Sequence, residues 1–216
     1  IIARGISKYM GIAATTFSIG DVPSINFASG SKLVLLGIIF AAVSMLYIVA
    51  FETFSKFFKA VLKNQYLIMA VGGGIVALLT LVLQSNEYLG TGISQIPDLL
   101  FVSAPWYVFL LKILFTAVSL GAGFKGGEIA PAMFVGASLG SFLAPMFGLP
   151  IPLVVACGMA AVFCGVTNSP ITAIVFSVEL FGASQIYYTM ICVAVSYLIS
   201  EYFSIYKTQK IMYSKY

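Results

Sequence analysis

One feature strongly limits what this chain can fold into: from Ile129 to Val178 it contains no charged residue. Charged side chains make up 8% of the whole chain, whereas soluble domains usually carry about 25%. A chain with so few charges cannot cover a surface that faces water. Inside a bilayer, a helix satisfies its own backbone hydrogen bonds. We therefore expect an all-α integral membrane protein.

Two uncharged segments are long enough to form helices that cross a bilayer, which takes about 20 residues. The first runs from Leu33 to Phe51 and the second from Tyr66 to Leu83. The last span is expected from Tyr187 to Tyr202. A further helix is expected from Pro105 to Leu120. The first span is followed by a basic segment that we interpret as a loop on the cytoplasmic side, with Lys56, Lys59 and Lys63.

Five prolines divide the uncharged region, and each removes one helical hydrogen bond. We expect short, tilted or broken helices there instead of two long straight spans. Broken helices whose ends meet inside the membrane are typical of transporters. Asn168 or Ser169 is expected to cap a helix with Pro170 at its first position. The five prolines are Pro131, Pro145, Pro150, Pro152 and Pro170.

A glycine-rich segment, Gly-Ala-Gly-Phe-Lys-Gly-Gly-Glu-Ile-Ala-Pro, occupies residues 121 to 131. Glycine lets the backbone turn sharply and lets a ligand approach the amides of Gly126 and Gly127. A helix that begins just after Gly127 would point its unpaired N–H groups, and the positive end of its dipole, at a bound anion. Pro131 fits the first turn of such a helix. We therefore expect an anion site at this helix start.

The charged residues near this segment each have two interpretations. Glu128 either contributes to an anion pathway or forms a structural pair with Lys125. Lys112, in the middle of a predicted helix, either attracts anions or extends to a membrane interface, and the sequence favours the interface.

Several function classes are excluded or disfavoured by the residues that are present. The sequence has no histidine, which excludes a serine–histidine protease and removes a common metal ligand. An aspartyl protease needs two facing carboxylates, whereas Asp21 and Asp98 lie in loop-like sequence. Cys157, Cys164 and Cys192 are interpreted as small buried side chains. We expect no enzyme, no metal site and no cofactor. We also expect no nucleic-acid partner, since the net charge of +4 reflects lysines in a few loops.

Three stretches together resemble the second half of the CLC family of chloride channels and anion/proton antiporters. They run from Lys112 to Pro131, from Asn168 to Leu180, and over Ser204-Ile-Tyr206. The resemblance extends over essentially the whole chain. It implies a single domain, residues 1–216, that forms one half of an inverted-repeat transporter fold with broken and tilted helices around a central anion.

The resemblance also implies which residues contact the anion. The backbone N–H groups of Glu128 and Ile129 would face it, and the hydroxyl of Tyr206 would donate to it from the other side. The family's filter loop and gating glutamate belong to a first half that is not in this sequence. We therefore predict a fragment that cannot transport alone. The predicted site consists of Gly126, Gly127, Glu128, Ile129 and Tyr206, with Lys125 and Lys112 as electrostatic support.

Glu128 departs from most chloride-transporting members, which have an apolar residue at this place. A glutamate in the setting Gly-Phe-Lys-Gly-Gly-Glu resembles the fluoride/proton antiporter branch. An ionised carboxylate repels an anion, whereas a protonated carboxyl donates a hydrogen bond from which fluoride gains more than chloride. We favour fluoride/proton exchange. A chloride channel or chloride/proton antiporter of the same fold is the alternative, and a structural membrane scaffold is a weaker one.

The partners implied by the resemblance are the lipid bilayer, the missing N-terminal half and a second copy of the protein. The helix near Pro170, the span from Tyr187 and the first helix of the chain would form the dimer contact. The expected location is a bacterial-type inner membrane, which the protein would cross several times. The only small species expected are protons and the transported halide, fluoride or chloride.

Overall fold

The structure is a computed structural model, and it describes residues 5–6, 9–11, 16–20, 22–200 and 203–206. All regular structure in these ranges is helical, which confirms the all-α prediction. By length and composition, α2, α3 and α6 can cross a membrane, and four shorter helices are also apolar. The elements are α2 (Phe27–Val61), α3 (Gln65–Leu83), η1 (Ile93–Gln95), α4 (Ile96–Leu99), α5 (Val108–Gly121), α6 (Ile129–Phe147), α7 (Ile151–Thr167), α8 (Pro170–Phe181) and α9 (Ile186–Ile199).

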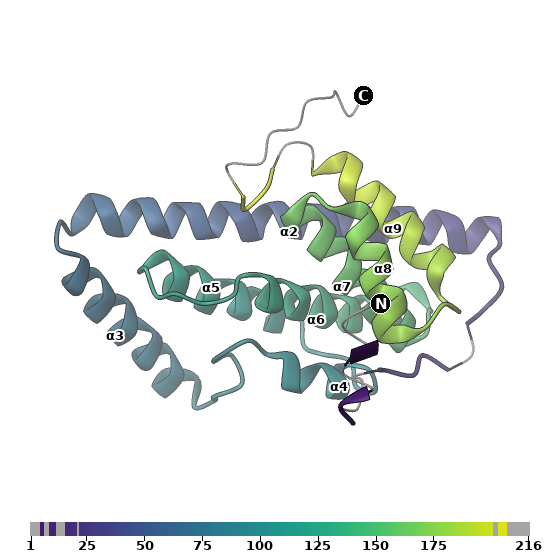
Figure 1. Ribbon diagram of the computed structural model, residues 1–216, viewed down its shortest axis with the longest axis horizontal. Helices are drawn as coiled ribbons and strands as arrows, with labels where there is room; N and C mark the ends of the chain where they lie inside the picture. The colour runs from purple at the N-terminus through teal and green to yellow at the C-terminus, as the bar shows by residue number, and fades with distance from the viewer. Residues whose placement is uncertain (1–4, 7–8, 12–15, 21, 201–202, 207–216) are drawn as a thin grey trace.

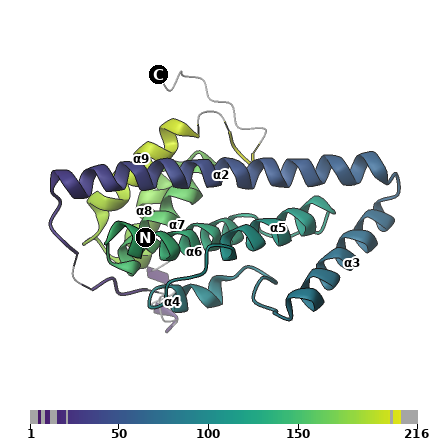
Figure 2. The same ribbon diagram turned by 180° about the vertical axis from the view of Figure 1, so that it is seen from behind.

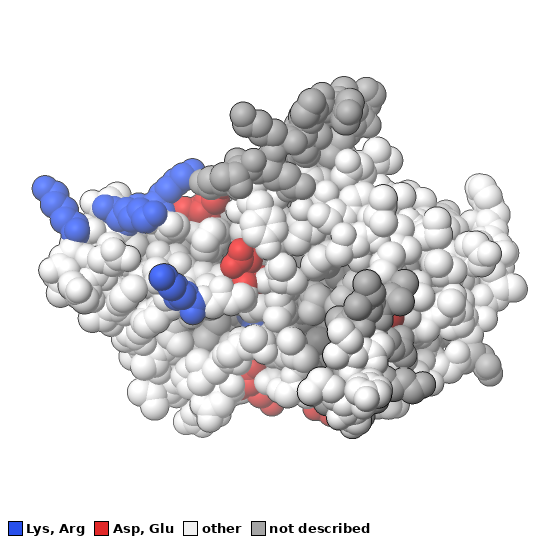
Figure 3. Space-filling model, in the orientation of Figure 1, with Lys and Arg blue, Asp and Glu red and all other residues white. Residues whose placement is uncertain are grey.

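The long helix α2 extends along the molecule, and α5 and α6 lie between it and α4 (Figures 1 and 2). Helix α2 contains the predicted first span but continues to Val61, so most of the expected basic loop is helical. Glu52 and Lys56, one turn apart, form an ion pair at 3.2 Å on the surface of this extension, a spacing that favours a helix weakly. Lysines gather at this end of the molecule, where α2 gives way to α3 (Figure 3).

The backbones of α6 and α7 approach closely because glycines meet between them. A Cβ atom at Gly136 would overlap the carbonyl of Gly158, and one at Gly140 would lie 2.6 Å from the carbonyl oxygen of Val154. All of α7 from Leu153 to Thr167 is buried. Small residues at helix contacts are the usual means of close packing in membranes, so α6 and α7 form a tightly packed pair.

Helix α6 is longer than its prolines predict, since it runs for 19 residues through Pro145. The expectation of only short helices in the uncharged region is therefore wrong for α6. Pro145 is tolerated because it lies near the end of the helix. The carbonyl that it leaves without a helical donor, that of Ser141, accepts a hydrogen bond from Ser103 Oγ at 3.1 Å. By contrast, α8 begins at Pro170 as predicted, and Ser169 occupies the N-cap position without a capping hydrogen bond from its side chain to a described residue.

The three consecutive glycines of α3, Gly72 to Gly74, differ in how closely they pack. Gly72 allows close packing, because a Cβ atom there would overlap the side chain of Ala122 at the end of α5. Gly74 does not, since a Cβ atom there would meet nothing within 4 Å.

Candidate functional site

The predicted helix start is present, and Glu128 is the N-cap residue of α6, which begins at Ile129. In the loop between α5 and α6, φ is positive at Gly123 alone, with a value of 90°, so the sharp turn occurs there. Gly126 and Gly127 contribute space instead of an unusual conformation. A Cβ atom at Gly127 would meet no atom within 4 Å, so a ligand can approach the backbone from this side.

The amide N–H groups at this helix start are unpaired. Those of residues 126 to 130 donate to no other residue that the structure describes, and Pro131 has no N–H to donate. The first hydrogen bond into the helix runs from the N–H of Ala132 to the carbonyl oxygen of Glu128, at 3.3 Å. Free donors at the positive end of a helix dipole can bind an anion without a full positive charge.

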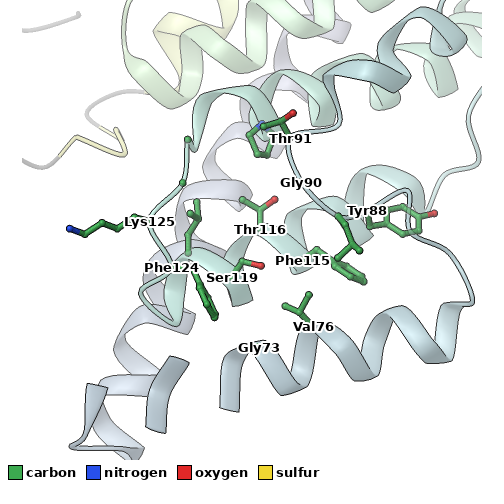
Figure 4. A pocket seen from close by; sticks show the side chains of 15 residues that line it. Gly73, Val76, Tyr88, Gly90, Thr91, Phe115, Thr116, Ser119, Phe124 and Lys125 are labelled. Carbon is green, nitrogen blue, oxygen red and sulfur yellow. The ribbon is translucent and has the colours of Figure 1, made fainter. Parts of the chain in front are cut away.

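Glu128 and Lys125 do not form the structural pair that was one interpretation of the sequence. The ion pair found among the described residues joins Lys56 and Glu52. Glu128 is half-buried, whereas Lys125 is exposed and its side chain points away from the neighbouring cavity (Figure 4). The Glu128 carboxyl therefore has no described cation within 4 Å to neutralise it.

A tyrosine that no sequence motif indicated contacts the start of α6. Tyr47 is buried in α2, and its hydroxyl donates to the carbonyl oxygen of Glu128 at 2.8 Å. At the other end of α6, Lys32 of α2 donates to the carbonyl oxygen of Phe147 at 2.7 Å. Helix α2 thus holds both ends of α6. The sequence feature that could have indicated the Tyr47 contact is a tyrosine inside an apolar span, because a buried hydroxyl needs a hydrogen-bond partner.

Lys112 does not extend to a membrane interface, so the favoured interpretation of this residue was wrong. Its side chain is fully buried. The Nζ atom donates to the carbonyl oxygens of Gly90 at 3.0 Å and Tyr88 at 3.1 Å, and it lies 5.1 Å from the centre of the Phe134 ring. Backbone carbonyls and an aromatic face replace the water that a buried ammonium group loses. Its role as electrostatic support for an anion stays a prediction.

Replacing Lys112 with methionine is expected to loosen the loop at residues 88–90. Hydrogen bonds from a charged donor contribute about 1.5–3 kcal/mol each, and methionine fills the space without replacing them. We expect amide hydrogen exchange in this loop to rise about tenfold or more, since 1.4 kcal/mol is a factor of ten. Lys59→Met, at an exposed position in α2, is the control. Unchanged exchange in the Lys112 variant would show that the lysine does not anchor the loop.

A cavity of about 400 Å³ lies between α3, α5 and the loop that precedes α6 (Figure 4). Its wall combines apolar side chains with the hydroxyl groups of Thr116 and Ser119. The Thr116 hydroxyl donates to the carbonyl oxygen of Lys112 at 2.7 Å. Gly126 and Gly127 also line the cavity. The unpaired amides therefore lie beside a space that a small ligand can enter.

Tyr206 lies in the last described segment of the chain, residues 203–206. The N–H of Ile205 donates to the carbonyl oxygen of Val166 on α7 at 3.0 Å, which attaches this segment to the core. The Tyr206 side chain is 39% exposed, and its hydroxyl forms no hydrogen bond with another described residue. Its contact with an anion at the start of α6 stays a prediction.

Cys157, Cys164 and Cys192 are buried and form no disulfide bond, which confirms their interpretation as small buried side chains. Asp98 is exposed and lies in the first turn of α4, not in a loop. Asp21 lies outside the described residues.

A comparison with models of known protein families identifies the family of this chain. The family model described as "Voltage gated chloride channel" matches residues 1–201. This chain belongs to that family, the CLC family. The resemblance noted in the sequence is thereby confirmed, and it extends over nearly the whole chain.

Similar proteins carry names that refer to chloride, or to both chloride and fluoride. A chloride/fluoride channel protein of Pseudomonas syringae pv. tomato is 35% identical over 222 residues, which cover 100% of this chain and 49% of the relative. An H(+)/Cl(-) exchange transporter ClcA of Yersinia pestis bv. Antiqua is 29% identical over 172 residues, covering 73% of this chain and 36% of the relative. This chain thus spans about half the length of such relatives, or less.

A solved structure supports the same family at the level of the fold. The crystal structure of a CLC-type fluoride/proton antiporter matches this chain with a TM-score of 0.90 and 32% sequence identity. The match covers 96% of this chain and 53% of that chain. The predicted fold class, an all-α CLC-type membrane protein, is confirmed.

Proposed function

We propose that this chain forms one half of the anion pathway in a CLC-type fluoride/proton antiporter. The observation that carries the proposal is the row of unpaired amides at the start of α6, with Glu128 as the N-cap residue. These donors suit a small anion without a full positive charge nearby. A protonated Glu128 would add a hydrogen-bond donor that favours fluoride, and an ionised one would release the anion by repulsion.

A chloride channel or chloride/proton antiporter of the same fold is the second candidate. The observation that favours it is the same row of unpaired amides, because backbone donors at a helix start bind anions in general, and one relative is named as an H(+)/Cl(-) exchange transporter. The two candidates differ in what Glu128 contributes, because only fluoride exchange needs its protonated carboxyl as a donor.

The complete transporter is proposed to be a homodimer that crosses a bacterial-type inner membrane several times. The family resemblance implies that α8 and α9 contact the second copy. Large side chains on both helices are exposed, which supports this: Ile171 of α8 is 78% exposed and Tyr187 of α9 is 68% exposed. The first helix, also implied, lies partly outside the described residues. A complementary N-terminal half would cover the open side of the helix start and complete the pathway.

Ion flux in liposomes tests the proposed function. The complete transporter, including an N-terminal half, is reconstituted with a fluoride or a chloride gradient, and anion and proton movements are recorded together. We expect fluoride movement coupled to protons, with much slower chloride movement. Equal or faster chloride flux would support the second candidate instead, and residues 1–216 alone are expected to give no flux.

The role proposed for Tyr206 is tested by removing its hydroxyl. Tyr206→Phe in the complete transporter is expected to weaken halide binding by about 0.5–1.5 kcal/mol, the usual net contribution of one hydrogen bond. Calorimetric titration with fluoride and with chloride measures this change. An unchanged affinity would leave Tyr206 as an interfacial tyrosine that anchors the end of a helix.

A further inference from the structure

Tyr47 is a buried side chain whose hydroxyl forms a contact that packing alone does not require. It is 2% exposed, and phenylalanine would fill nearly the same volume. Its hydroxyl donates to the carbonyl oxygen of Glu128 at 2.8 Å. That oxygen also accepts the N–H of Ala132 at 3.3 Å. The carbonyl would therefore keep a partner without Tyr47, so the contact is not needed simply to satisfy a buried acceptor.

The position of this carbonyl fixes the direction of a donor at the candidate site. The C=O of Glu128 and the N–H of Ile129 belong to one planar trans peptide group, in which they point in opposite directions. A hydrogen bond that holds the oxygen toward Tyr47 on α2 therefore directs the N–H away from α2. This N–H is one of the unpaired donors at the start of α6.

The same contact strengthens the donor. When a carbonyl accepts a hydrogen bond, its peptide group becomes more polarised, and linked hydrogen bonds strengthen one another by about 10–30% each. The Glu128 carbonyl accepts two bonds, from Tyr47 and from Ala132. The N–H of Ile129 is thus made a better donor by a tyrosine that itself carries no charge.

We propose that Tyr47 is a positioning residue of the anion site, which orients and polarises the Glu128–Ile129 peptide group through the Glu128 carbonyl. The proposal rests on the proposed function of the α6 start as an anion site. Tyr47 acts only through the peptide group and does not touch the anion.

The test compares two buried tyrosines in the complete transporter. Tyr188 is a matched control, because it is also 2% exposed and its hydroxyl donates to a backbone carbonyl, that of Pro23, at 3.0 Å. Fluoride affinity is measured by calorimetry and thermal stability by unfolding. We expect Tyr47→Phe to weaken fluoride binding about 3- to 10-fold, the effect of losing roughly one hydrogen bond. Tyr188→Phe is expected to leave the affinity within about twofold of the unsubstituted protein.

The two measurements separate a positioning role from a structural one. A structural role would lower the unfolding temperature of both variants and leave both affinities unchanged, and that result would overturn the proposal. If Tyr47→Phe does not fold, 3-fluorotyrosine at position 47 replaces it, since it keeps the shape and donates more strongly. Tighter fluoride binding would then support the proposal, and unchanged binding would overturn it.

Failure of this inference is distinguishable from failure of the proposed function. If the unsubstituted transporter binds neither fluoride nor chloride, the proposed function itself is wrong. If it binds fluoride and loses proton coupling on Glu128→Gln, but its fluoride affinity does not change on Tyr47→Phe, only the role of Tyr47 is wrong.

Discussion

Glu128→Gln in the complete transporter is expected to reduce fluoride-driven proton movement by roughly 100-fold. A positioned side chain that transfers protons contributes about 10²–10⁴-fold to a rate. Glutamine cannot take this role, because its amide does not bind and release a proton near neutral pH. Glutamine has nearly the same shape, and its amide can still donate to an anion. Fluoride binding should therefore persist while its coupling to protons is lost. The measurement is simultaneous recording of fluoride and pH in liposomes.

The control for this prediction is Glu87→Gln. Glu87 is an exposed acid in the loop after α3, so its substitution changes the charge by the same amount away from the helix start. It is expected to leave coupling unchanged. If Glu128→Gln also keeps the original coupling and fluoride selectivity, the role assigned to Glu128 is wrong, whatever the fold.

The second large effect is expected at the contact between α6 and α7. Gly136→Val would place a side chain where even a Cβ atom overlaps the carbonyl of Gly158. Because the neighbouring atoms belong to a backbone, they cannot rotate away, and the two helices must separate. Overpacking typically costs about 1–3 kcal/mol, occasionally more, and we expect the upper end here.

Thermal unfolding and the yield of monodisperse protein measure the effect of Gly136→Val. Gly74→Val in α3 is the matched control, since a Cβ atom at Gly74 meets nothing within 4 Å. The control is expected to unfold near the temperature of the unsubstituted protein. Similar unfolding temperatures for both variants would mean that the α6–α7 contact is less tight than the structure indicates.

The helix start at Glu128 could be predicted from the sequence because its signals are local. Gly126 and Gly127, followed by an apolar run with Pro131 in the first turn, indicate a helix that begins with free amides. The start of α8 at Pro170 was predictable for the same reason. In both cases the residues that determine the boundary are neighbours in the sequence.

The features that the sequence did not reveal depend on contacts between distant residues. The carbonyls that surround Lys112 belong to a loop some 20 positions earlier, at Tyr88 and Gly90. The bond from Tyr47 to Glu128 joins residues 81 positions apart. Pro145 does not end α6 early. The carbonyl of Ser141, which loses its helical donor because of Pro145, accepts a hydrogen bond from the distant hydroxyl of Ser103. The residue pattern within one helix does not indicate which group of a distant segment will form a hydrogen bond with it.

The central claim is that the unpaired amides at the start of α6 hold the anion. The most direct measurement is solid-state NMR of the complete transporter in bilayers, with ¹⁵N-labelled glutamate and isoleucine and bound fluoride. Dipolar dephasing of ¹⁵N by ¹⁹F reports the distance between each amide and the ion. We predict dephasing at the amides of Glu128 and Ile129 that corresponds to about 3 Å, the length of an N–H hydrogen bond. Bound fluoride that dephases other amides, and leaves these two unaffected, would contradict the account.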